Sequence, residues 1–238
     1  MNMSEKIVAL VTGANKGIGF ETARQLAQKG ITVLLGARDK VKGEEAAKKL
    51  RDESLDVRFL PVDVNDQKTH DAAAKFIEEE FGRLDILINN AGIVEDYDVP
   101  ASAGTLDRWR KTFETNVFNL VALTQTLLPL IKKSQAGRIV NLSSSMGSLK
   151  LNREASSSTA YNASKAAVNM LTINLANELK DTPIKVNSAD PGWVKTEMGG
   201  ANALLAVEDG AKTSIALATL PADGDTGKFF HLNEELPW

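Results

Sequence analysis

The feature that most constrains the fold of this chain is a glycine-rich turn that links an apolar run to an amphipathic stretch. Residues 7–11 are apolar without alternation, which is typical of a parallel strand buried on both faces. The positions after residue 19 have helical spacing, which Lys29 and Gly30 end with a basic last turn and a glycine stop. The turn over residues 12–19 therefore directs backbone N–H groups and the positive end of a helix dipole at one point, which suits a phosphate.

The glycines of this turn have the spacing G-x-x-x-G-x-G, with Gly13, Gly17 and Gly19 at the fixed positions. Gly13 allows a tight turn, and the other two remove a Cβ atom where a ligand or the next strand comes close. The more common dinucleotide fingerprint is G-x-G-x-x-G, and a glycine turn without context marks a plain strand-to-helix connection equally well. The strand before it and the helix after it favour a cofactor site. Its candidate residues are Gly13, Asn15, Lys16, Gly17, Ile18 and Gly19.

Strand and helix patterns alternate along the chain, which predicts a parallel sheet with helices on both faces. With right-handed crossovers this is a single-domain α/β fold over residues 1–238, a Rossmann-type, doubly wound sheet of about seven strands. The predicted strands lie near 6–12, 31–36, 56–61, 84–89, 137–142, 184–188 and 227–231. The predicted helices cover 17–29, 40–52, 66–81, a long region from about 105 to 133, 159–179, a short lid within 196–206, and 207–219.

The composition excludes several classes of protein. A net charge of −3 argues against an obligate nucleic-acid binder, and the absence of cysteine excludes disulfides and thiolate metal sites. His70 and His231 are isolated from each other in the sequence, so we predict no metal site. Residues 1–6 have no apolar signal region, and no apolar stretch reaches the ~18 residues that span a bilayer. We therefore expect a soluble, cytoplasmic protein with no nucleic-acid or membrane partner.

The end of the second strand indicates which dinucleotide binds. Arg38 follows that strand, and Lys16 in the glycine turn reaches the same place, with Lys42 close in sequence. Cationic side chains suit the 2′-phosphate of NADP(H), whereas an acidic residue there would bind the ribose of NAD. Asp39, one residue further on, leaves that second interpretation open. We favour NADP(H).

Two further strand ends contribute to the same predicted crevice. Asp63 follows the third strand and is either an acceptor for the adenine amino group, with Val64 packed on the ring, or a cap of the helix over 66–81. Asn65 and Asp66 are alternative caps. The fourth strand ends at Asn89, predicted to bond neighbouring strands, and is followed by three small or amide residues against which a flat cofactor can lie: Asn90, Ala91 and Gly92.

The chemistry is carried by a tyrosine and a lysine on one helix. Tyr161 and Lys165 are four positions apart and share a helix face. The pKa of a free tyrosine is about 10, and a nearby ammonium together with an oxidised nicotinamide is expected to lower it. Tyr161 would then exchange a proton with a carbonyl oxygen, while a serine from the strand end at residues 143–145 bonds that oxygen.

These motifs together resemble the short-chain dehydrogenase/reductase family, in its NADPH-dependent carbonyl reductase-like branch, over nearly the whole chain. The resemblance implies that Asn116, Ser144, Tyr161 and Lys165 carry catalysis. Tyr161 would be the acid/base, Lys165 would lower its pKa and bind the nicotinamide ribose, and Ser144 would orient the carbonyl. Asn116 would kink its helix and hold a water joined to Lys165, or else be a polar residue satisfied between two helices. Ser144 is chosen from three consecutive serines by aligning the strand end.

The resemblance also assigns the segment after the sixth strand to the cofactor and substrate. It implies cofactor contacts from Pro191, Gly192, Val194 and Thr196, and a substrate lid near residues 193–206. Trp193, Met198 and the leucines at 204 and 205 belong either to this lid or to core packing. The segment near residues 150–159 is longer than in compact family members and is expected to form a loop at the pocket rim. A homo-oligomer is possible within this resemblance.

The predicted function is hydride transfer between NADP(H) and a carbonyl or alcohol substrate, most simply the reduction of an aldehyde or ketone. One alternative is a non-catalytic module that senses a dinucleotide, which the presence of both Tyr161 and Lys165 disfavours. The other is an alcohol-oxidising dehydrogenase of the same fold. The reaction is reversible, so the sequence leaves its direction in the cell open.

Overall fold

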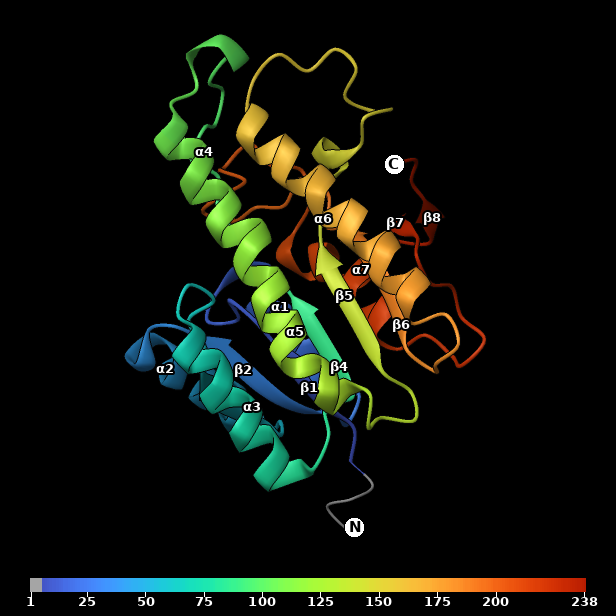
Figure 1. The fold of residues 1–238 in the computed structure, drawn as a ribbon. Coiled ribbons are helices and arrows are strands. Elements are labelled where there is room, and N and C mark those ends of the chain that lie inside the picture. The colour runs from blue at the N-terminus through green and yellow to red at the C-terminus, as the bar shows by residue number, and fades with distance from the viewer. Residues whose placement is uncertain (1–5) are drawn as a thin grey trace.

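A computed structural model of the protein describes residues 6–238 and forms a single eight-stranded sheet in the order β3-β2-β1-β4-β5-β6-β7-β8 (Figure 1). Strands β1 to β7 pair in parallel, as predicted, and only β8 is antiparallel. The α/β doubly wound fold is confirmed. The strands are β1 (Val8–Val11), β2 (Thr32–Ala37), β3 (Val57–Pro61), β4 (Ile86–Asn89), β5 (Arg138–Leu142), β6 (Lys185–Asp190), β7 (Phe229–His231) and β8 (Glu234–Glu235).

The eighth strand was not predicted because it carries no pattern to find. Glu234 and Glu235 are exposed. They pair antiparallel with His231 and Phe230 of β7 and so form a short hairpin with that strand. We predicted that residues 1–6 contain no signal region. Residues 1–5 lie outside the part of the chain that the structure describes. Within residues 6–238, no helix combines the length and apolarity that crossing a membrane requires.

Helices cover both faces of the sheet. Buried side chains of α1, α2 and α7 form one apolar cluster and those of α3, α5 and α6 another, and Figure 1 shows α3, α5 and α6 in front of the sheet. Ala9 and Val11 of β1 belong to the first cluster, whereas Val8 and Leu10 belong to the second. The helices are α1 (Gly17–Gln28), α2 (Lys40–Asp52), α3 (Gln67–Phe81), α4 (Leu106–Phe113), α5 (Asn119–Ile131), α6 (Thr159–Glu178) and α7 (Val207–Ala218).

The long helix predicted from about 105 to 133 is divided in two. A π-helical turn over Glu114–Phe118 separates α4 from α5, and Asn116 at its centre is buried. A π turn adds one residue to the helical repeat and displaces the following side chains around the axis. The π turn thus lies where the resemblance implied a kink at Asn116.

The short helix predicted within residues 196–206 is absent, and this prediction was wrong. The segment forms turns, closed by a bridge between Val194 and Leu205 and by a hydrogen bond of 2.8 Å from Trp193 Nε1 to the Gly199 carbonyl. Gly199 and Gly200 are consecutive, and glycine is a poor helix former. Gly200 also has a φ of +75°, which a right-handed helix excludes.

A ladder of buried polar side chains crosses the sheet beneath α5 and α6. Asn89 Nδ2 donates to Asn141 Oδ1 at 2.9 Å and to Thr124 Oγ1 of α5 at 3.0 Å. Asn141 Nδ2 and Ser188 Oγ both donate to Thr172 Oγ1 of α6, each at 2.9 Å. The predicted role of Asn89 in joining strands is confirmed, and the ladder connects β4, β5 and β6 to both covering helices.

We expect Asn141→Ala to lower the free energy of unfolding by about 1–3 kcal/mol, because it leaves buried partners of Asn89 and Thr172 without their bonds. Urea unfolding followed by circular dichroism measures this. The matched control is Asn174→Ala, which removes an exposed helical asparagine and should change the free energy by about 0.5 kcal/mol or less. Equal effects of the two substitutions would contradict a stabilising ladder.

Candidate active site

The glycine turn lies at the carboxyl ends of β1 and β4, where the strand order of the sheet reverses. Thr12 Oγ1 accepts hydrogen bonds of 3.0 Å from the backbone N–H groups of Asn90 and Ala91. Asn90 Nδ2 in turn donates to the Thr12 carbonyl at 2.7 Å. The two strand ends are thus fixed to each other, at the position where doubly wound sheets bind their ligands.

The backbone of the turn fits a pyrophosphate. Gly13 has a φ of +62°, as the predicted tight turn requires. At Gly19 a Cβ atom would lie 2.5 Å from Asn90 Nδ2 and 2.7 Å from the Gly13 carbonyl, so this glycine serves the close approach of the next strand end. Helix α1 begins at Gly17 with no side-chain cap and no acidic residue in its first turn, which leaves its N-terminus suited to an anion.

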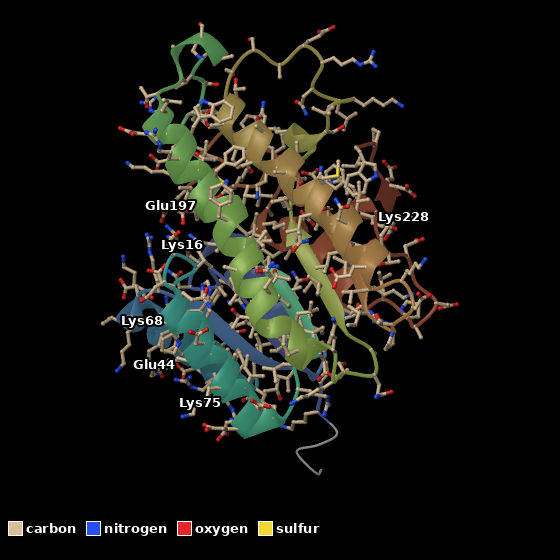
Figure 2. All side chains as sticks on the ribbon, viewed as in Figure 1. Lys16, Glu44, Lys68, Lys75, Glu197 and Lys228 are labelled. Atoms are coloured by element: carbon tan, nitrogen blue, oxygen red, sulfur yellow. The ribbon has the colours of Figure 1, made fainter. Side chains whose placement is uncertain are left out.

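A groove of about 870 Å³ adjoins the turn. Its charged lining consists of five basic side chains (Lys16, Arg24, Arg38, Lys42 and Lys49) and five acidic ones (Asp39, Glu45, Asp52, Glu53 and Glu197). Asp39, the residue that left NAD open as an alternative, caps α2 by accepting the Lys42 backbone N–H at 3.0 Å. Lys16 forms an exposed ion pair with Glu197, and the labelled side chains of the two lie next to each other in Figure 2. Lys16 in the turn and Arg38 directly after β2 are the cations of this groove that would suit a 2′-phosphate.

Asp63 is not the cap of α3. That cap is Asp66, whose side chain accepts the Lys68 backbone N–H at 3.0 Å, while Asp63 Oδ1 accepts from the Asn65 backbone within its own turn. Val64 is partly buried against the apolar cluster of α3. The adenine contact of these two residues stays a prediction.

Tyr161, Lys165 and Ser144 lie together beside the turn. Lys165 Nζ is 5.6 Å from the centroid of the Tyr161 ring and donates to the Leu142 carbonyl at 2.7 Å. The Ser144 hydroxyl accepts the Met146 backbone N–H at 3.2 Å, and its proximity to the Tyr161 phenol lowers the pKa of that group. A Cβ atom at Gly92 would lie 3.6 Å from Lys165 Nζ, so the small residues after β4 border this cluster directly.

The pKa values in this cluster are set mainly by burial. Loss of hydration raises the pKa of Tyr161 to about 12, with the Ser144 hydroxyl acting in the opposite direction and the charge of Asp190 adding to the rise. Burial lowers the pKa of Lys165 to about 8. The sequence predicted a lowered pKa for Tyr161. Among the chain's own residues the opposite holds, and the phenol keeps its proton at neutral pH.

The buried side chain of Asn116 has its hydrogen-bonding groups paired with the loop after β4 and with α6, as expected for a polar residue between two segments. Its Oδ1 accepts from the Ile93 backbone N–H at 2.8 Å, and its Nδ2 donates to the Ile93 carbonyl at 2.9 Å and to Ser164 Oγ at 3.1 Å. The π turn therefore clamps the loop after β4 to α6. The proposed water-mediated connection from Asn116 to Lys165 stays a prediction.

The three consecutive serines have different surroundings. Ser143 is buried, and its hydroxyl donates to the Lys165 carbonyl at 3.3 Å. The Ser145 backbone N–H donates to Asp190 Oδ1 at 2.9 Å. Of the three, Ser144 is the one whose hydroxyl acts on the pKa of Tyr161. Its role in catalysis stays a prediction.

The segment after β6 packs on the glycine turn. Thr196 Cγ2 would lie 3.4 Å from a Cβ atom at Gly17, which places Thr196 over the start of α1. Val194 is buried, whereas Trp193, Met198 and Leu204 are exposed, so core packing is ruled out for these three. The segment over 150–159 forms the expected loop, which bridges Ser157 to Pro100 (Figure 1).

Two buried acids near the site were not identified from the sequence. Asp96 accepts from the Ala160 backbone N–H at 2.7 Å and from the Tyr161 N–H at 3.3 Å, and so fixes the start of α6 from a loop about 64 residues away. Asp190 ends β6 and is 4% exposed. Its position at a strand end, directly before Pro191 and Gly192, was a signal that could have indicated a site residue.

Comparison with known proteins agrees with this geometry. A family model described as short chain dehydrogenase matches residues 7–204. The chain is 39% identical over 227 residues to short-chain dehydrogenase anuI of Penicillium roqueforti, covering 90% of this chain and 89% of that protein. It is 33% identical over 279 residues to carbonyl reductase [NADPH] 1 of Rattus norvegicus, covering 99% of each chain.

Solved structures give the same result. The NADPH-bound carbonyl reductase from chicken fatty liver has a TM-score of 0.87 and 29% identity, with 98% of this chain and 100% of that chain covered. Salutaridine reductase from Papaver somniferum has a TM-score of 0.86 and 32% identity, with 94% and 99% covered. The glycine turn, the groove beside it and the cluster of Tyr161, Lys165 and Ser144 therefore belong to a short-chain dehydrogenase, the family of which this chain is a member.

Proposed function

We propose that this enzyme reduces aldehydes or ketones with NADPH. The observation that carries the proposal is the cluster of Ser144, Tyr161 and Lys165, which borders the small residues after β4 at Gly92. Among the relatives whose names specify a reaction, the NADPH carbonyl reductases and salutaridine reductase are named for reduction, and two (+)-neomenthol dehydrogenases are named for oxidation. Most of these names therefore support reduction.

The cofactor would be held along the carboxyl edge of the sheet. Lys16 and Arg38 would bind the 2′-phosphate, Asp63 and Val64 the adenine, and the start of α1 the pyrophosphate. The nicotinamide half would contact residues of three segments: Asn90, Ala91 and Gly92 after β4, Tyr161 and Lys165 of α6, and Pro191, Gly192, Val194 and Thr196 after β6. When bound, NADPH supplies the hydride.

The chain's own residues hold and protonate the carbonyl oxygen. Ser144 donates a hydrogen bond to that oxygen and orients the substrate, and Tyr161 transfers its phenolic proton to it. The high pKa of Tyr161 keeps this proton in place at neutral pH, which is the protonation state that reduction requires. The Lys165 ammonium, held by the Leu142 carbonyl, stabilises the phenolate that remains.

Two other functions fit this site less well. Oxidation of an alcohol starts from the phenolate, which burial of Tyr161 disfavours. A module that only senses a dinucleotide has no need for a serine, a tyrosine and a lysine in mutual contact. We also propose that the exposed residues Trp193, Met198 and Leu204 form the lid over a small-molecule substrate within residues 193–206. The one-domain boundary, cytoplasmic localisation and homo-oligomeric assembly stay predictions.

Tyr161→Phe should lower kcat for carbonyl reduction by at least roughly 100-fold, because it removes the proton donor while keeping the ring. NADPH consumption against a panel of ketones, aldehydes and quinones measures this. Tyr97→Phe is the matched control, because Tyr97 is the other of the two tyrosines in the chain and is 56% exposed. Unchanged rates in Tyr161→Phe would refute the mechanism.

Ser144→Ala should reduce kcat roughly 100-fold or more, the loss typical of removing a hydrogen-bond donor to the reacting oxygen. Ser145→Ala keeps its backbone bond to Asp190 and should retain most of the activity. The same assay compares the two variants, with circular dichroism as the control for folding. If Ser145→Ala is the inactive variant, the functional serine is one position further on.

Arg38→Ala should weaken NADPH binding roughly tenfold and leave NADH binding nearly unchanged, because only NADPH carries the 2′-phosphate. Fluorescence titration with each cofactor gives the two Kd values. Arg110→Ala removes an exposed arginine of α4 and serves as the control. Equal losses for NADPH and NADH would place Arg38 outside the phosphate site.

A further inference from the structure

Asp190 is a buried acid that the proposed mechanism does not use. It is the last residue of β6 and pairs in register with His231, the last residue of β7. Asp190 Oδ2 lies 3.1 Å from His231 Nδ1, and Oδ1 accepts the Ser145 backbone N–H at 2.9 Å. Both carboxylate oxygens are therefore engaged, one toward the serine turn and one toward a neighbouring strand.

The Ser145 contact connects Asp190 to the reacting groups. Ser145 begins the 3-10 turn Ser145–Gly147, and the hydroxyl of the preceding Ser144 acts on the pKa of the Tyr161 phenol. A displacement of Asp190 would therefore move the backbone that places the Ser144 hydroxyl. A neutral acceptor would hold the Ser145 N–H group equally well. Burial of a charged carboxylate is costly, so this hydrogen bond alone does not explain why an aspartate that is 4% exposed lies here.

The charge of Asp190 acts on the phenol. The charged groups near Tyr161 come from α6, β6 and the loop after β4: Lys165, Asp190 and Asp96, whose carboxylate accepts the Tyr161 backbone N–H at 3.3 Å. Behind Asp190 lies His231 of β7, whose side chain is 29% exposed. The Asp190 carboxylate raises the pKa of Tyr161, in addition to the larger effect of burial.

We propose that Asp190, paired with His231, is a positioning residue for carbonyl reduction. Its carboxylate anchors the turn that carries Ser144 and places a negative charge near the Tyr161 phenol, so the phenol keeps its proton until the substrate oxygen takes it. This inference rests on the proposed function for its consequence in catalysis. The electrostatic effect on Tyr161 does not depend on any substrate and can be measured separately.

The chain offers a direct measurement, because it contains only two tyrosines. In a Tyr97→Phe background Tyr161 is the sole tyrosine, and its ionisation is followed by tyrosinate absorbance as the pH is raised with NADP+ present. Circular dichroism at each pH confirms that the protein remains folded. Asp190→Asn keeps an acceptor for the Ser145 N–H and removes the charge. We expect it to shift the tyrosinate curve to lower pH by roughly one pH unit.

His231→Gln is the second variant and keeps the Asp190 charge. Its tyrosinate curve should stay in place, because the substitution leaves the Asp190 carboxylate charged. The pH dependence of alcohol oxidation should move in the same direction as the tyrosinate curve in each variant. Superimposed curves for Asp190→Asn and its parent, or a shift to lower pH in His231→Gln, would overturn the proposal.

The two proposals fail in different ways. If Tyr161→Phe retains its activity, the proposed catalytic function is wrong, yet the absorbance titration still reports whether Asp190 acts on the phenol. If Asp190→Asn leaves the titration unchanged while Tyr161→Phe is inactive, the mechanism stands and Asp190 only holds the backbone.

Discussion

The hydrogen bonds between Thr12 and Asn90 are the constraint on which the rest of the site depends. They connect the ends of β1 and β4 at the one point where neighbouring strands are followed by crossovers in opposite directions. The side chain of Asn90 also fills the space that a Cβ at Gly19 would need, so the start of α1 lies directly against the end of β4. One set of contacts thus positions the glycine turn and the small residues that border Lys165.

Burial then decides the chemistry of the two ionisable groups. It raises the pKa of Tyr161 and lowers that of Lys165, so each group is biased toward its neutral form. A neutral phenol is a proton donor, and a lysine whose pKa is about 8 is still charged at neutral pH. The pair is therefore ready to donate a proton and to stabilise the product anion, which is the order of events in reduction.

Local patterns in the sequence predicted much of this structure, and long-range contacts account for what they missed. The glycine turn and the four-residue spacing of Tyr161 and Lys165 are fixed by neighbours in the chain, and the family that they indicated is confirmed. The cap of α6 by Asp96 and the contact of Asp190 with Ser145 join residues 45 or more positions apart, and no periodicity encodes them. The helix expected within 196–206 failed because contacts of Trp193 and Val194 override its apolar pattern.

The ion pair of Lys16 and Glu197 is compatible with a phosphate site in the same groove. Both side chains are well exposed, and exposed ion pairs are weak because water screens them. A phosphate dianion offers Lys16 more charge than one carboxylate, and Arg38 and Lys42 line the same groove. Because Glu197 and Thr196 are adjacent, the segment that contacts Gly17 is also the segment whose charge faces Lys16. The placement of the segment after β6 therefore depends on the same residues that line the groove beside the glycine turn.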